Sequence, residues 1–177
     1  MWASGTGSEF LRKLATEKPN MFFHVPASYG WQAVILREEP FVYIGHYVGR
    51  GMKPCTGDHL TCRWCKHGFG KKLRAVFSMM DSRTKETGVF EVSDVTAGLM
   101  LRAMDEFREM FASARGLAFV FKKEDDKKNG AIRVKCLQGL AGGSDLPEGP
   151  DPQHVMVKMW TSPEKADVAE LPKECQP

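Results

Sequence analysis

Residues 46–65, HYVGRGMKPCTGDHLTCRWC, decide how the middle of this chain folds. Within this stretch Cys62 and Cys65 form a C-x-x-C pair, and six residues separate Cys55 from that pair. Two cysteines separated by two residues can turn both sulfurs toward one ion, and a tetrahedral site then needs two further ligands from elsewhere. Because three of the five cysteines in the 177-residue chain are clustered here, we expect a metal site rather than a disulfide framework.

Three histidines compete for the fourth ligand position. His67 lies too close to Cys65 for easy tetrahedral geometry, and His59 would need a cramped ring inside the loop that leads to the C-x-x-C pair. His46 ends a predicted strand and precedes a glycine-rich loop, so the sheet can hold its ring against the cysteines. We therefore favour His46 and keep His59 as the alternative.

The ligand types indicate which ion is bound. Three thiolates and one imidazole suit Zn²⁺ better than harder ions that prefer oxygen. Four protein ligands leave no open coordination position, so the expected cofactor is one structural zinc ion held by His46, Cys55, Cys62 and Cys65. Two other interpretations remain open. One is a redox-active C-x-x-C, which belongs at the start of a helix rather than in a glycine-rich loop, and the other is cysteines that only pack.

The rest of the chain is predicted to be mainly β. Segments rich in β-branched and aromatic residues predict strands at 31–36, 41–48, 73–80, 89–92, 117–122, 131–137 and 154–160. One long helix is expected from Ser93 or Asp94 to about Ala114, with a core-facing stripe made of Val95, Leu99, Ala103, Met104, Phe107, Met110, Phe111 and Ala114. This pattern favours an α+β fold, an OB-fold-like barrel with an inserted zinc subdomain at about 44–72.

We expect a single domain at 21–160, with a segment at each end that does not belong to it. Residues 1–20 are interpreted as a tag remnant, which contains the cloning-site sequence GSEF at 7–10, followed by a flexible arm. Residues 161–177 are interpreted as a flexible acidic tail. The sequence shows neither a run of about 18 apolar residues nor a signal-peptide pattern, so we expect an intracellular protein, in the cytoplasm or nucleoid, without membrane contact.

Basic and aromatic residues alternate around the cysteines. Nine lysines and arginines but only two aspartates lie between His46 and Lys85, which points to a polyanionic partner. Proteins that bind single-stranded nucleic acid combine cations along the phosphates with aromatic faces on which bases stack. The candidate contacts are Trp64, the first choice for stacking, and Tyr47, Phe69, Arg50, Lys53, Arg63, Lys66, Lys71, Lys72 and Arg74.

The order of the ligand residues resembles a known family. His46, Cys55 and the Cys62–Cys65 pair, followed by a basic strand and the helix, resemble the zinc-containing single-stranded-DNA-binding proteins (helix-destabilising proteins) of T4-type phages over about residues 33–137. The resemblance implies a structural zinc in a subdomain attached to an OB-fold, with DNA in a basic, aromatic-lined cleft between the two parts. It also implies cooperative binding through a basic arm, here Arg12 and Lys13, and docking of replication proteins by the acidic tail.

The sequence therefore predicts a protein that coats and protects single-stranded DNA during replication or recombination of a phage or mobile element, with RNA as partner left open. No enzyme is expected, because the sequence has no P-loop, dinucleotide fingerprint, H-E-x-x-H or paired-carboxylate motif. The alternative is a zinc-stabilised interaction module whose basic face docks an acidic replication partner. A zinc-ribbon binder of duplex fits less well, because the long helix mixes acidic and basic residues.

Overall fold

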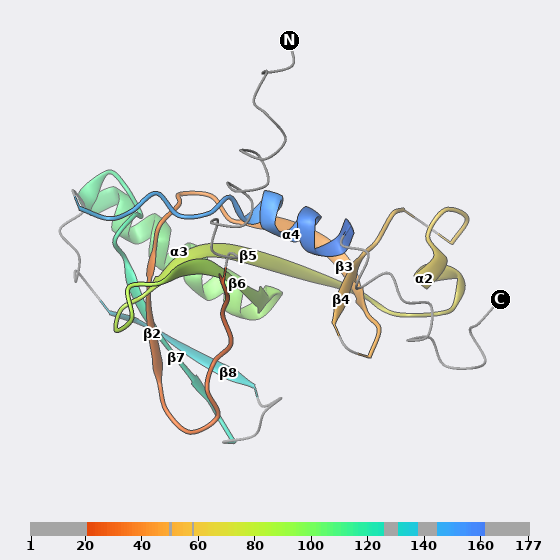
Figure 1. Cartoon of the computed structure of the whole chain (residues 1–177), viewed down its shortest axis with the longest axis horizontal. Coiled ribbons are helices and arrows are strands. Elements are labelled where there is room, and N and C mark those ends of the chain that lie inside the picture. Colours follow the sequence, from red (N-terminus) through yellow and green to blue (C-terminus); the bar gives the residue numbers. More distant parts are fainter. Residues whose placement is uncertain (1–20, 50, 58, 126–130, 138–144, 162–177) are drawn as a thin grey trace, which may run out of the picture.

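The computed structural model describes residues 21–49, 51–57, 59–125, 131–137 and 145–161 (Figure 1). The predicted arm at 1–20, the acidic tail beyond residue 161 and Arg50 lie outside these ranges. The elements are β1 (Met21–Phe22), β2 (Trp31–Ile35), β3 (Phe41–Tyr47), β4 (Met52–Pro54), α2 (Arg63–Lys66), β5 (Lys71–Asp81), β6 (Thr87–Ser93), α3 (Asp94–Phe111), β7 (Ala118–Lys123), β8 (Ile132–Leu137) and α4 (Pro152–Thr161). The mainly β, α+β class is confirmed, as are all predicted strands except the last.

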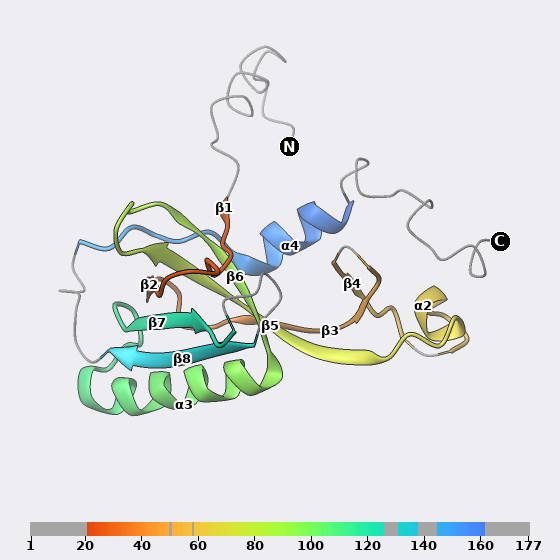
Figure 2. The same ribbon diagram turned by 90° about the horizontal axis from the view of Figure 1, so that it is seen from below.

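The sheet is built around β5, its longest strand, with 11 residues. The main path runs β1-β6-β5-β2-β7-β8, and every pairing in it is antiparallel except that of β1 with β6. The other edge of β5 is shared by two strands, because residues 71–76 pair with β3 and residues 79–81 pair with β2. β3 and β4 therefore leave the main path as a ribbon that projects from the sheet toward α2 (Figure 2).

The sheet is open, which differs from the OB-fold-like barrel that the sequence led us to expect. β1 and β8 are the outer strands of the main path, and in the described part of the chain no pairing joins them. A closed barrel needs a single cyclic path of strands with a consistent tilt and register. Here the path branches at β5, and one branch is used to carry the ligand residues instead of closing the sheet.

Helix α3 covers one face of the sheet and closes the larger core. Its N-cap is Ser93, whose side chain accepts a hydrogen bond from the backbone N–H of Thr96, as predicted. The buried side chains of the helix are Thr96, Ala97, Met100, Met104 and Phe107. They pack against aromatic residues of the sheet, including Trp31, Phe77, Phe90, Phe119 and Phe121.

The predicted apolar stripe of α3 is only partly correct. Met104 and Phe107 are buried, but Val95, Leu99, Met110 and Phe111 are exposed. The helix contains a second set of apolar residues at three- and four-residue spacing, which begins at Ala97 and continues through Met100. Periodicity alone does not select between two overlapping stripes, and the packing of the sheet selects the second.

The segment at 154–160 is a helix, not the predicted last strand. Pro152 occupies the first helical position, where its missing N–H costs nothing, and the carboxylate of Asp151 accepts hydrogen bonds from the backbone N–H groups of Gln153 and His154. The alternation of HVMVKMW misled the prediction, because a short apolar segment fits either period. α4 packs on the sheet face opposite α3, where Trp160 contacts Tyr43 with 4.9 Å between ring centroids.

Two arginines hold the segment that leads to α4. Arg37 Nε donates to the carbonyl of Gly149 (2.7 Å), and Arg115 donates to the carbonyls of Leu146 and Pro147. The backbone of Gly149 lies so close to the sheet that an added Cβ would be 2.7 Å from Leu36 Cβ and would overlap Ser78 Oγ. None of the helices in the described ranges combines the length and the apolarity needed to cross a membrane.

Two glycine substitutions test this packing. Gly149→Ala is expected to lower the free energy of unfolding by about 1–3 kcal/mol, because the new methyl group overlaps Leu36 and Ser78. Gly98→Ala, on the exposed side of α3, adds a Cβ that meets nothing within 4 Å and is expected to raise stability by roughly 0.5–1 kcal/mol. Urea unfolding of both variants measures the effects, and equal stability of the two would contradict this account.

Candidate metal centre

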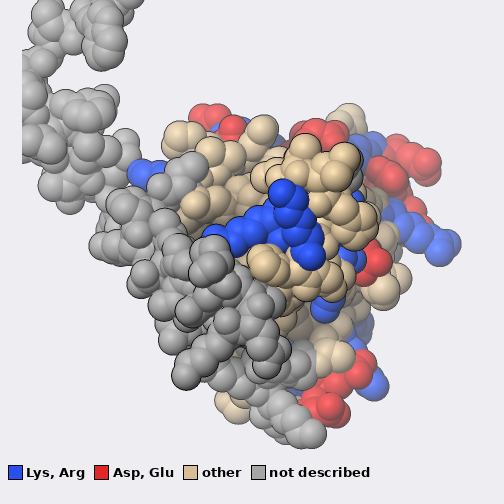
Figure 3. All heavy atoms as spheres, turned by 90° about the vertical axis from the view of Figure 1, so that its right-hand side faces the viewer, with Lys and Arg blue, Asp and Glu red and all other residues tan. Residues whose placement is uncertain are grey.

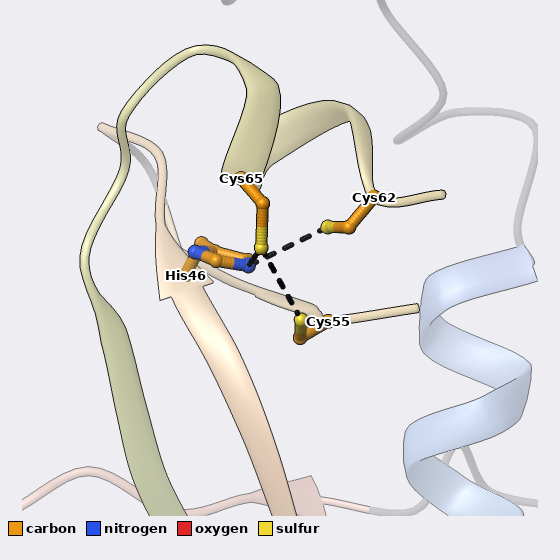
Figure 4. Close-up of side chains that lie close together, drawn as sticks. All are labelled: His46, Cys55, Cys62 and Cys65. Carbon is orange, nitrogen blue, oxygen red and sulfur yellow. Dashed lines mark hydrogen bonds between the residues drawn. The ribbon is translucent and has the colours of Figure 1, made fainter. Parts of the chain in front are cut away.

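Four side chains from three parts of the chain converge on one point at the end of the β3–β4 ribbon (Figure 4). They are His46 at the end of β3, Cys55 just after β4, Cys62 at the N-cap of α2 and Cys65 within α2. Their potential ligand atoms, one from each residue, all lie within 4.8 Å of one another. This cluster could hold one metal ion, and it contains the four residues that the sequence analysis favoured.

Backbone pairing explains how the residues meet. β3 and β4 form a hairpin in which His46 lies opposite Lys53, and the backbone N–H of Cys55 donates to the carbonyl of Ile44, which keeps Cys55 beside the end of β3. α2 is a single helical turn closed by a hydrogen bond from the N–H of Lys66 to the carbonyl of Cys62. The expectation that the C-x-x-C lies in a loop was therefore wrong, since Cys62 is the N-cap of this short helix and Cys65 lies within it.

The ring of His46 has a fixed orientation. It is fully buried, and its Nδ1 lies 2.9 Å from the carbonyl oxygen of Phe69 and 3.2 Å from that of Gly70. A carbonyl can only accept, so Nδ1 carries the proton and the lone pair of the neutral ring is on Nε2. Nε2 lies 3.5 Å from the sulfur of Cys62 and 3.6 Å from that of Cys65. A histidine ligand is commonly oriented by such a second hydrogen bond.

The three sulfurs have different tendencies to ionise. Burial opposes ionisation of Cys62, but the backbone N–H groups of Cys65, Thr56 and Trp64 outweigh it and lower its pKa to about 5. Burial and the neighbouring sulfurs of Cys55 and Cys62 raise the pKa of Cys65 to about 11. The sulfurs of Cys55 and Cys65 are only 3.7 Å apart, so a cation between them would favour ionisation of both.

The alternative histidine does not join the cluster. His59 is exposed, and its Nδ1 lies 3.1 Å from the backbone carbonyl of Cys65. His67 is also exposed and follows α2 as its C-cap. The sequence analysis missed the carbonyls of Phe69 and Gly70 as partners of the ligand His46, because a backbone acceptor leaves no signal in side-chain identities.

The three cysteines belong to a small projecting unit that we call the metal-ligand lobe, residues 51–57 and 59–70, and His46 contacts it from the end of β3. Trp64 lies half-buried on the surface of the lobe. Its ring contacts the ring of Phe69 in an edge-to-face arrangement, with 5.8 Å between the ring centroids. The guanidinium of Arg63 lies over the Trp64 ring at 5.4 Å. Lys66 is exposed beside them. Viewed onto this end of the molecule, lysine and arginine side chains cross the middle of the surface and acidic side chains lie toward its rim (Figure 3).

The predicted nucleic-acid contacts on β3, β4 and the first residues of β5 lie on two opposite faces of these paired strands. The strand register places Lys53 and Lys71 on the same face as the ligand His46. On this face Lys71 Nζ donates a hydrogen bond to the carbonyl of Gly57 (2.9 Å). Tyr47, Lys72 and Arg74 lie on the opposite face. Arg74 is half-buried and pairs with Glu91 at 3.3 Å, so its guanidinium is already engaged.

Comparison of this chain with models of protein families, with curated proteins and with solved structures finds no match.

Substitution of single histidines tests the ligand set. Wild-type protein is expected to bind one metal ion per chain, and His46→Ala to lose it, because three sulfurs alone leave the fourth position open to solvent. His59→Ala is the matched control and is expected to keep full metal content, because its ring is outside the cluster. Metal content by atomic emission spectrometry decides, and retention by His46→Ala with loss by His59→Ala would reverse the assignment.

Proposed function

We propose that the cluster binds one structural zinc ion and that the protein binds single-stranded DNA, with the metal-ligand lobe as part of the contact surface. The observation that carries the proposal is that α2, which together with its N-cap holds two cysteines of the cluster, also carries the exposed cations Arg63 and Lys66 and the half-buried Trp64. In this proposal the ion orders the lobe, and the lobe presents Trp64, Arg63 and Lys66 to the strand.

The spacing of the ligand atoms supports zinc. A tetrahedral ion with Zn–S of about 2.3 Å and Zn–N of about 2.0–2.1 Å requires S···S separations of about 3.8 Å and S···N separations of about 3.6 Å. The separation of the Cys55 and Cys65 sulfurs is 3.7 Å, and those of His46 Nε2 from the sulfurs of Cys62 and Cys65 are 3.5 and 3.6 Å. Three thiolates and one imidazole are also the donor set that zinc prefers.

The closed ligand set supports a structural role for the ion. Four protein ligands fill a tetrahedral shell, so no position remains for a substrate or an activated water. Cys62 and His46 are fully buried, and Cys65 is only 3% exposed. A zinc ion bound here would join the β3–β4 hairpin to α2 and so stabilise the lobe.

The side chains around the cluster support binding of a single strand. Aromatic rings that stack on bases and cations that follow phosphates are the two components of such surfaces. Trp64 and Arg63 provide both within one short helix, and Arg63 already lies on one face of the indole. A base that stacks on Trp64 would use the other face or replace Arg63, which would then be free to reach a phosphate.

The order of the ligands supports a specific biological role. We assign to this chain the role of the T4-type phage family that it resembles in sequence, namely coating and protecting single-stranded DNA during replication or recombination. In that role the acidic tail would dock other replication proteins. The cleft of that family lies between a zinc subdomain and an OB-fold, whereas the main body here is an open sheet, so the path of the strand is to be defined on this fold.

One observation favours the second candidate, a zinc-stabilised module that docks a protein. Val42, Ile44 and Leu73 are each about half exposed, and register places them together on the face of the ribbon between the metal-ligand lobe and α3. Exposed apolar side chains of this kind are typical of protein interfaces. A protein-docking module has no need of affinity for oligo-dT, so the same titration separates the two candidates.

Zinc removal is the first test of the proposed function. Chelation of zinc, or the substitution Cys62→Ser, is expected to lower the melting temperature and to disorder the lobe, because zinc binding and folding of the lobe are coupled. Zinc content and thermal unfolding of the same preparations measure this. Unchanged zinc content and stability in Cys62→Ser would refute the site.

The second test separates stacking from charge in binding to oligo-dT. Trp64→Ala is expected to cost about 1–3 kcal/mol of binding free energy while the salt dependence stays nearly unchanged. Arg63→Gln combined with Lys66→Gln should lower the log–log salt slope by about 1.4, at about 0.7 per phosphate contact. Arg102→Gln, which removes an exposed cation from α3, is the control and should bind as wild type.

These titrations are done by fluorescence anisotropy on variants whose zinc content and melting temperature have been checked. A wild-type protein that binds duplex as tightly as oligo-dT, or whose affinity does not respond to salt, would favour the protein-docking candidate. A folded, zinc-loaded Trp64→Ala variant with wild-type affinity would remove the indole from the contact surface.

A further inference from the structure

A second surface with cations and an exposed aromatic ring lies at the far end of β5 from the metal-ligand lobe. It is formed by β2, β7 and β8, whose pairing aligns Gln32 with Val120 and Val120 with Lys135. Lys122 and Arg133 form the next pair on the same face. The core residues Phe119 and Phe121 point to the other face, toward α3, and α4 packs elsewhere, on residues of β3, β5 and β6 (Figure 2).

Three cations, Lys122, Arg133 and Lys135, lie close together on this face across β7 and β8. Lys122 lies directly opposite Arg133, an arrangement of like charges that destabilises a sheet unless an anion compensates it. Arg133 is paired with Glu124 at 2.7 Å, and Asp125 lies near it. Within the described ranges neither Lys122 nor Lys135 forms an ion pair, and both are exposed.

An aromatic ring and a pocket adjoin these cations. Tyr29 is 50% exposed, and the guanidinium of Arg83 lies 6.0 Å from the centre of its ring. Tyr29, Gln32 and Arg83 help to line a pocket of about 380 Å³. Gly30, which follows Tyr29, lies close to β7, because a Cβ added there would come within 3.2 Å of Val120, two residues from Lys122.

The acidic group of the pocket is already engaged. The carboxylate of Asp81 accepts hydrogen bonds from Trp31 Nε1 at 2.7 Å and from the backbone N–H groups of Arg83 and Thr84. Burial raises the pKa of Asp81, but these hydrogen bonds and the Arg83 charge outweigh it and lower the pKa overall. Asp81 therefore anchors the β5–β6 turn, and Arg83 and the lysines remain available to an anion.

We infer that Tyr29, Arg83, Lys122 and Lys135 form a second contact surface for the single strand, with Tyr29 as a stacking platform and the cations on phosphates. The inference rests on the proposed function, because it assigns a further surface to the same ligand. Polyanions as a class are favoured by the charges, and a single strand in particular is favoured by the exposed ring.

The distance between the two surfaces defines a length test. Lys71 and Asp81 are the ends of β5, which at about 3.3 Å per residue places the metal-ligand lobe roughly 33 Å from the β5–β6 turn. A short oligonucleotide therefore contacts one surface at a time, whereas a long one spans both. The second surface is expected to contribute to the binding of an oligo-dT of about 30 nucleotides more than to that of about 4 nucleotides, which is too short to reach both surfaces.

The experiment compares sheet-end variants with matched controls by anisotropy with labelled oligo-dT of both lengths. Tyr29→Ala is expected to weaken binding of the long strand roughly 5- to 150-fold, and Tyr29→Phe, which keeps the ring, to bind as wild type. Lys122→Gln combined with Lys135→Gln is expected to lower the salt slope for the long strand by about 1.4. Arg102→Gln on α3 is expected to leave the slope unchanged.

Three outcomes would overturn the inference. Wild-type affinity and slope in both the Tyr29→Ala and the double-lysine variants would exclude the surface while the metal-ligand lobe keeps its proposed role. Aggregation of the double-lysine variant, with unchanged affinity of the soluble fraction, would show that these charges only protect the edge strand β8. Absence of any oligo-dT binding by wild-type protein would refute the proposed function itself and the second surface with it.

Discussion

The order of the metal-ligand lobe depends on the His46, Cys55, Cys62 and Cys65 cluster. Neither hydrophobic core cluster contains a residue between 55 and 70, and the described part of the lobe contributes only Met52 to them, so apolar burial stabilises the lobe less than the main body. Three kinds of contact hold this part of the chain: backbone hydrogen bonds, the contacts of His46 Nδ1 with two backbone carbonyls, and the contacts among the ligand atoms of the cluster. A metal ion bound at the cluster, as we propose, would offset part of the conformational entropy that ordering such a small unit costs.

The long strand β5 connects this lobe to the rest of the fold. Its first residues pair with β3, which carries His46, and its last residues pair with β2 in the larger core. One continuous strand therefore joins the lobe to the larger core. The same strand separates the two candidate contact surfaces by its own length, so their spacing is set by a rigid element of the sheet.

The sequence predicted six of the strands, the start of α3 and the four residues of the cluster, because these depend on local pattern and on ligand chemistry, but it missed the short strands β1 and β4. It did not predict that the sheet stays open, because the branch at β5 is decided by which edges pair. It also mistook α4 for a strand, because the cap at Asp151 and the packing of Trp160 on Tyr43 outweigh a seven-residue alternation. Backbone partners such as the Phe69 carbonyl leave no trace in side-chain identities.

The number of lysines and arginines in the sequence around the cysteines is larger than the number that the structure leaves available for contact with nucleic acid. Arg74 pairs with Glu91, which also accepts a hydrogen bond from Tyr43, so this arginine belongs to the fold. Lys71 donates to the Gly57 carbonyl and fixes the loop of the cluster. Part of the positive charge around the cysteines, on Arg74 and Lys71, is therefore engaged in contacts within the fold, and part of it, such as Lys66 on α2, lies exposed beside Trp64. If the protein binds a single strand as we propose, the salt dependence of that binding should reflect this smaller number of cations rather than the full count.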